Sequence, residues 1–225
     1  MSRFFQKALK QWRNNLPGHS LPELIVLVEG PTEIILLPLL ALRLGIDLNA
    51  LGAMLIAAGG ANQVAKKYAQ LKEIVAIPIF CLLDRDAEQQ KNLIAGQLRS
   101  EDYLYTLKEG EIEDLIRMDS FVPLINRYLV TGQYGALGLE PVQESDFEPG
   151  LSRTAVLERL WRQRNLGKFD KVGFARFIAE VSAIETVSGT TSQATAGSLA
   201  VHEITPDGRL LIKTLAACQS RARQN

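Results

Sequence analysis

Two short apolar runs that end on acidic residues constrain the fold of this chain most strongly. The first run, residues 24–28, stops at Glu29, and the second, residues 77–83, stops at Asp84. Short apolar runs bounded by turn residues are typical of strands that are buried on both faces of a parallel sheet. Because ligands bind beyond the carboxyl ends of such strands, we expect the two acids to meet at one edge of the sheet.

Strand and helix patterns alternate through the N-terminal half of the chain. The expected order is a strand at about 23–28, a helix at 32–44, a strand at 53–58, a helix at 62–73, a strand at 77–83, a helix at 87–99 and a strand at 103–107. This alternation predicts an α/β fold with a mostly parallel sheet flanked by helices. Within it, Pro38 should kink or interrupt its helix, and Asn62 should cap the next one.

The pattern changes after Asp119, where helical periodicity dominates. Helices are expected at 119–130, 152–165 and 170–186, and the stretch 188–198, rich in Ser, Thr, Gly and Ala, is expected to be a linker. The turn residues at 206–208 indicate a small hairpin. At the other end, residues 1–15 have the pattern of an amphipathic helix.

Composition narrows the class of protein. The chain is 47% apolar and 22% charged, which is ordinary for a globular protein with a sizeable core. No apolar run has the roughly 18 residues expected of a membrane span, and the N-terminus lacks a secretory pattern, so we expect a cytoplasmic protein. The two cysteines, Cys81 and Cys218, make a disulfide framework or a thiolate zinc site improbable.

The formal net charge is zero, but the charges are unevenly distributed. Residues 84–119 carry ten acids and five bases, which leaves the stretch at minus five. Residues 151–176 carry seven bases and two acids, which leaves plus five. An acidic centre with basic flanks suits a metal site that also holds a polyanion, although solvated helix faces would give the same counts.

Three acidic motifs follow one another along the chain, at residues 27–33, 83–86 and 110–115. Their order and spacing resemble the Toprim domain of the OLD (overcoming lysogenization defect) family nucleases. The resemblance covers residues 20–120 well and extends more loosely to about residue 185. It implies a Toprim-like (Rossmann-like) sheet with a helical C-terminal extension. It also implies a metal-dependent endonuclease that hydrolyses the phosphodiester bonds of nucleic acid; DNA is favoured over RNA, and the sequence leaves both open.

The resemblance also assigns roles to individual residues. It implies Mg²⁺ or Mn²⁺ as cofactor, held by six carboxylates: Glu29, Glu33, Asp84, Asp86, Glu111 and Glu113. It implies catalytic roles for Glu29, Asp84 and Lys171, with Lys168 as an alternative to Lys171. Arg85, Lys168 and Lys171 would contact nucleic acid.

The residue types suit this chemistry independently of the resemblance. Hard divalent cations prefer carboxylate oxygens, and two such ions about 3.5–4 Å apart can stabilise both the attacking and the leaving oxygen of a phosphodiester. Six acids on three segments could hold such a pair. A lysine could offset the negative charge that develops on the phosphate.

On this basis the chain divides into four parts. These are an N-terminal extension at 1–20, a Toprim catalytic core at 21–120, a helical extension at 121–187, and a linker with a C-terminal tail at 188–225.

Two features depart from the family pattern. The family usually joins this domain to an ABC-type ATPase, yet the chain has no Gly-x-x-x-x-Gly-Lys-Ser/Thr phosphate loop. We therefore expect a free-standing nuclease or a split system with a separate ATPase, for which the basic helix at 1–15 could be a docking element. A homodimer is also compatible with the family. The second departure is Leu82, where some relatives have a small polar residue.

Other interpretations stay open. Glu33, Asp84, Asp86 and the acids at 111–114 could simply stabilise helix starts. An Asp-x-Asp motif after an apolar strand also resembles the haloacid dehalogenase phosphatases, although that motif normally closes the first strand. A Toprim-like module that binds nucleic acid without cutting it is a third alternative.

Overall fold

The computed structural model describes residues 3–15, 21–187 and 203–222. Its centre is one four-stranded sheet in the order β2-β1-β3-β4. The strands are β1 (Leu24–Val28), β2 (Ala53–Ala57), β3 (Ile79–Leu83) and β4 (Tyr103–Thr106). All three pairings are parallel, so the predicted parallel α/β fold is confirmed.

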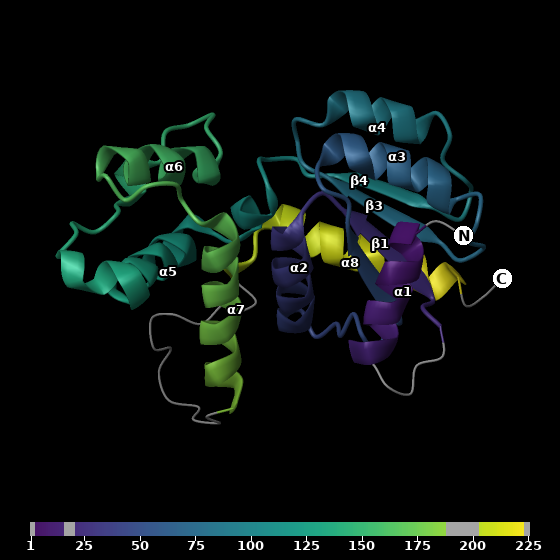
Figure 1. Cartoon of the computed structure of the whole chain (residues 1–225), viewed down its shortest axis with the longest axis horizontal. Coiled ribbons are helices and arrows are strands. Elements are labelled where there is room, and N and C mark those ends of the chain that lie inside the picture. Colours follow the sequence, from purple (N-terminus) through teal and green to yellow (C-terminus); the bar gives the residue numbers. More distant parts are fainter. Residues whose placement is uncertain (1–2, 16–20, 188–202, 223–225) are drawn as a thin grey trace.

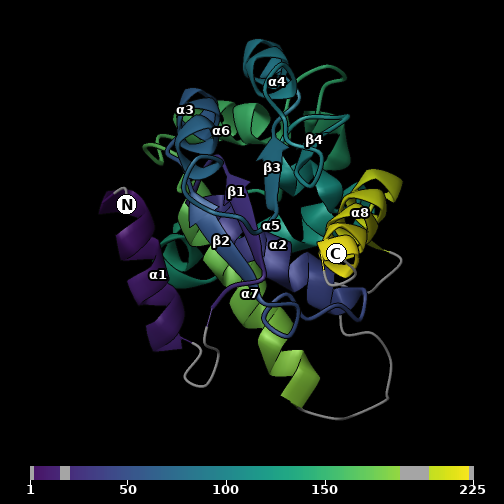
Figure 2. The ribbon, with the colours of Figure 1, turned by 90° about the vertical axis from the view of Figure 1, so that its right-hand side faces the viewer.

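Helices cover both faces of this sheet (Figures 1 and 2). One face packs against α1 (Arg3–Asn15), α3 (Ala61–Leu71) and α4 (Glu88–Ala95), and the other against α2 (Pro31–Arg43) and α8 (Pro206–Ala222). Strand β1 is buried throughout because its side chains alternate between the two cores. This double burial explains why its sequence is continuously apolar.

The remaining helices form an extension beside the sheet, with α5, α6 and α7 at the left of Figure 1. They are α5 (Met118–Val130), α6 (Arg153–Gln163) and α7 (Lys171–Val187), with short 3₁₀ helices η1 (Ile112–Leu115), η2 (Gly132–Leu137) and η3 (Glu144–Asp146) between elements. Edge-to-face aromatic contacts hold the extension together, including Phe121 with Phe174 at 5.6 Å between ring centroids. Arg43 of α2 ties it to the sheet by donating a 2.6 Å hydrogen bond to the carbonyl oxygen of Ser182 in α7.

The N-terminal amphipathic helix is confirmed as α1. Its apolar residues Phe5 and Trp12 are buried against the sheet, so this stripe is covered by the body of the protein. The basic residues Lys7, Lys10 and Arg13 remain exposed.

Two sequence expectations about local structure, a hairpin at 206–208 and a cap at Asn62, were wrong. Residues 206–208 do not form a hairpin but begin α8, since Pro206 suits a first helical position and the Thr205 hydroxyl oxygen accepts a hydrogen bond from Gly208 N at 3.2 Å. Gly60 rather than Asn62 precedes α3. Helix α2 continues through Pro38 without interruption. The predicted breaker at 17–18 and the linker at 188–198 lie outside the described residues.

No helix in the described part of the chain combines the length and apolar character needed to cross a bilayer.

Candidate functional site

The ends of the two central strands bring the first two acids together. Strands β1 and β3 are neighbours, and Asp84 N donates a 2.9 Å hydrogen bond to Glu29 Oε1. The carbonyl oxygen of Glu29 accepts hydrogen bonds from Gly59 N at 2.7 Å and Gly60 N at 2.8 Å. These bonds fix the backbone of Glu29 at the carboxyl edge of the sheet, where the sequence predicted it.

Glu33 lies one helical turn later, in the first turn of α2. Its side chain is buried, and Oε2 accepts a 3.2 Å hydrogen bond from Gly30 N. Glu33 therefore does stabilise the start of a helix, as one interpretation of the sequence proposed. Burial raises its pKa, while the charge of Lys171 acts to lower it.

The third acidic motif faces Lys171, at the start of α7. Lys171 Nζ lies 2.6 Å from Glu111 Oε2 and 3.3 Å from Glu113 Oε2. The longer contact is an ion pair without hydrogen-bond geometry, so the two carboxylate oxygens of Glu113 have no hydrogen-bond partner among the described residues. A buried carboxylate in this state gains from a second cation.

The pKa values reflect this crowding of acids. Burial, followed by the charges of Glu29 and Glu33, raises the pKa of Asp84 to about 8. Burial raises the pKa of Glu113 to about 7, even though Lys171 opposes the shift. Burial would lower the pKa of Lys171, but the carboxylates of Glu113 and Glu111 outweigh it, so the pKa of this lysine is raised and it stays charged. The site thus carries more negative charge than the half-buried Lys171 balances.

The other predicted residues lie further from this centre. Asp86 and Arg85 are exposed in the turn after β3. Neither Asp84 nor Asp86 caps α4, because the residue before that helix is Ala87 and it has no side-chain cap. Lys168 is exposed beside a separate groove that includes Phe169, so it is Lys171 that reaches the acids.

Two residues at the start of α6 complete the site, and sequence reasoning did not find them. Thr154 Oγ1 donates a 2.8 Å hydrogen bond to Glu111 Oε2, the oxygen that also contacts Lys171. Arg153 pairs with Asp114 at 3.3 Å and donates hydrogen bonds to the carbonyl oxygens of Glu113 and Ile116. The N-terminus of α6 therefore clamps the acidic turn η1. The sequence indicated a role for Arg153 and Thr154 only through their position in the basic stretch 151–176.

Gly110 is required by the shape of the same turn. Its φ angle is +59°, and a Cβ atom at this position would overlap the Asp114 carboxylate. The Asp114 carboxylate accepts a 2.8 Å hydrogen bond from Glu111 N. Glycine at position 110 leaves room for the carboxylate to make this bond.

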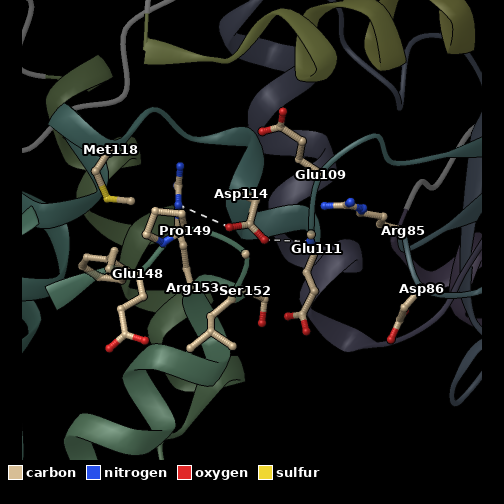
Figure 3. Close-up of a pocket in the computed structure, with 14 residues that line it drawn as sticks. Arg85, Asp86, Glu109, Glu111, Asp114, Met118, Glu148, Pro149, Ser152 and Arg153 are labelled. Atoms are coloured by element: carbon tan, nitrogen blue, oxygen red, sulfur yellow. Dashed lines mark hydrogen bonds and ion pairs between the residues drawn. The ribbon is translucent and has the colours of Figure 1, made fainter. Parts of the chain in front are cut away.

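A cleft of about 840 Å³ opens beside the acids (Figure 3). Asp86 and Glu111 lie on one side of it, and Pro149 and Met118 on the other. The site is therefore open to a ligand larger than an ion.

Metal-binding geometry is incomplete in this state of the protein. Among the residues that the structure describes, no three His, Cys, Asp or Glu side chains converge closely enough to hold a metal ion. Lys171 accounts for part of this, because it already pairs with Glu111 and Glu113.

Comparison with known proteins finds a family model that matches this edge of the sheet. Residues 23–86, which include Glu29, Glu33, Asp84 and Asp86, match the family model described as "Overcoming lysogenization defect protein-like, TOPRIM domain". This segment is similar to an OLD-like Toprim domain. A search of curated proteins found no match.

Solved structures extend the likeness beyond this Toprim segment. The C-terminal region of the OLD protein of Xanthomonas campestris pv. campestris aligns with a TM-score of 0.57 and 18% identity, covering 92% of this chain and 100% of that one. The C-terminal region of the Burkholderia pseudomallei OLD protein aligns with a TM-score of 0.55 and 15% identity, covering 88% of this chain and 98% of that one. At these identities the likeness concerns the fold, and it spans the Toprim sheet and the helical extension together.

Proposed function

We propose that this protein is a divalent-metal-dependent nuclease that cleaves phosphodiester bonds, with DNA as the favoured substrate. The observation that carries the proposal is that buried and half-buried acids from three chain segments interact electrostatically with Lys171, two of them, Glu111 and Glu113, in direct contact with it. An OLD-like Toprim domain supports a nuclease family. The metal dependence, the substrate and the residue roles are our inference.

The residues fit a hard divalent cation in type and in charge. Glu113 has buried oxygens without hydrogen-bond partners among the described residues. Burial, and then repulsion by Glu29 and Glu33, raise the pKa of Asp84, and a bound cation would offset both effects. Mg²⁺ or Mn²⁺ would be held by carboxylates drawn from the six predicted ligands: Glu29, Glu33, Asp84, Asp86, Glu111 and Glu113. When bound, the metal supplies Lewis-acid activation of water and of the phosphate.

The chain's own residues would orient the reaction. Lys171 Nζ is fixed by two carboxylates and would offset negative charge on the phosphate. Thr154 donates a hydrogen bond to the same oxygen of Glu111 that contacts Lys171. Arg85, exposed at the mouth of the cleft, and Lys168, exposed beside the neighbouring groove, would contact the backbone of the nucleic acid.

A separate ABC-type ATPase and a second copy of this chain are proposed partners. The exposed basic residues of α1 (Lys7, Lys10 and Arg13) offer a docking surface for the ATPase. A pull-down in which removing residues 1–15 leaves the bound partners unchanged would count against that role.

The proposal is tested by cleavage of supercoiled plasmid with Mg²⁺, Mn²⁺ or EDTA. Glu29→Gln and Asp84→Asn should each lower the rate at least about 100-fold, the order associated with loss of a group that stabilises the transition state. Glu88→Gln is the matched control, because Glu88 is an exposed acid in the first turn of α4 and pairs only with Lys91.

Each alternative predicts a different result. Hydrolysis of para-nitrophenyl phosphate without cleavage of nucleic acid would identify a phosphatase. Metal-independent binding of nucleic acid without cleavage would identify an inert Toprim-like module.

A further inference from the structure

The cleft beside the acids has two walls of different chemistry. The inner wall carries Asp86, Glu109 and Glu111, next to the carboxyl edge of the sheet. The outer wall is largely apolar and is formed by Met118, Phe147, Pro149 and Leu151. Leu151 is 49% exposed, and Met118 and Phe147 are half-buried, so the apolar side chains of this wall are accessible from the cleft.

The outer wall is poorly suited to phosphate. Its only cation is Arg153, and that guanidinium is already bound to Asp114 and to two backbone carbonyl groups, and lies 4.7 Å from the centroid of the Phe121 ring. Glu148, on the same side, is paired with Arg159 at 2.7 Å. A polyanionic backbone would therefore gain no free positive charge there from the described residues.

A nucleobase matches both walls. The faces of its ring can pack on the apolar side chains. Its edge can donate hydrogen bonds to an exposed carboxylate such as Glu109, and it can donate a hydrogen bond to the Ser152 hydroxyl or accept one from it. The volume of about 840 Å³ lies within the usual range of small-molecule sites. A base inside a duplex is stacked and paired, so only an unpaired or extruded base could enter.

We propose that this cleft binds an unpaired nucleobase next to the phosphodiester bond that is cut. The inference rests on the proposed nuclease function and specifies its substrate as a strand with at least one unpaired nucleotide. Arg85 lines the cleft on the same side as Asp86 and Glu109, where the backbone of that nucleotide would pass.

A thermodynamic cycle between the protein and the substrate tests this directly. Wild-type protein and Leu151→Ser are titrated in EDTA with fluorescent single-stranded DNA oligonucleotides that carry one abasic site, moved through each position in turn. At one position of the oligonucleotide, the abasic site should weaken binding to the wild-type protein about tenfold, the order expected for the loss of one stacked base. Leu151→Ser should bind more weakly and lose most of this sensitivity.

Leu137→Ser is the matched control, because Leu137 is 54% exposed in the same helical extension but does not line the cleft. It should respond to abasic sites as the wild type does. The inference is overturned if no position is sensitive, if Leu151→Ser keeps the full sensitivity, or if a blunt duplex binds as tightly as single strands.

The readout separates this inference from the proposed function because binding is measured without metal. Position-dependent binding without any cleavage in Mg²⁺ or Mn²⁺ would support the base site and reject the nuclease. Cleavage without any position dependence of binding would support the nuclease and reject the base site.

Discussion

The carboxyl group of Asp84 lies among other carboxylates, and burial together with those charges raises its pKa from 3.8 to about 8. In the unfolded chain the group ionises near its ordinary pKa, whereas in the metal-free folded protein it stays protonated up to about pH 8. Between these values the unfolded state binds fewer protons than the folded state. The free energy of unfolding should therefore fall as the pH rises from about 4 to 8.

This dependence is measurable by thermal melting in EDTA between pH 5 and 8.5. Asp84→Asn cannot ionise, so it should flatten the decline and raise the melting temperature at pH 8 by on the order of 5 °C. Some slope should remain, because the pKa of Glu113 is also raised, to about 7. Asp119→Asn, at an exposed position, should keep the wild-type slope, and an identical slope in Asp84→Asn would contradict the prediction.

At the scale of elements, the contact between α6 and η1 decides whether the third acidic motif is ordered. Arg153 spans the two elements with a planar guanidinium that contacts one carboxylate and two carbonyl oxygens. A lysine has one compact charged group and cannot reproduce this arrangement.

Arg153→Lys should lower the free energy of unfolding by about 2–4 kcal/mol, as expected when buried polar partners lose a charged donor. Urea denaturation measures this loss. Arg159→Lys on the same helix is the control, since its pair with Glu148 is largely exposed and should contribute less than about 1 kcal/mol. Equal losses in the two variants would refute the clamp.

The elements also show what local sequence can and cannot predict. The position of Glu29 and Asp84 at one edge of the sheet was predictable, because the ends of two buried parallel strands follow from periodicity and from the rules of parallel sheets. That β1 and β3 are neighbours was not predicted and comes from the structure. The role of Arg153 was not predictable, because its partner Glu113 is 40 residues away in the sequence. An arginine at the start of a helix could equally well face solvent. Pro206 was misread since the same Pro-Asp-Gly residues suit both a turn and a first helical turn, and tertiary packing of α8 decides between them.

At the scale of the whole molecule, the C-terminal helix is part of the main core. Leu211 and Leu215 of α8 are fully buried in the same cluster as the sheet residues Leu24 and Val26. Asp207 at its start accepts hydrogen bonds from the Tyr105 hydroxyl at 2.6 Å and from Lys108 N at 2.9 Å. The segment that sequence assigned to a tail therefore supports the sheet that carries the acids.

Adjacent leucines on α8 provide a direct test. Leu211→Ala should lower the free energy of unfolding by about 2–5 kcal/mol, because it leaves a cavity in the core. Leu210→Ala, at a side chain that is 45% exposed, should change it by no more than about 0.5 kcal/mol. Chemical denaturation of both variants measures the difference, and similar values would mean that α8 packs only loosely.

The site joins residues that are far apart in the chain, with Glu29 near one end of the described sequence and Lys171 beyond its middle. During synthesis on the ribosome, the first acids emerge long before the lysine that balances them and before the helix that completes the core. Under the proposed function, a nascent or prematurely terminated chain would hold the carboxylates without the geometry to use them. The order of assembly would thus protect the cell's own nucleic acid until Lys171 and α8 have been synthesised.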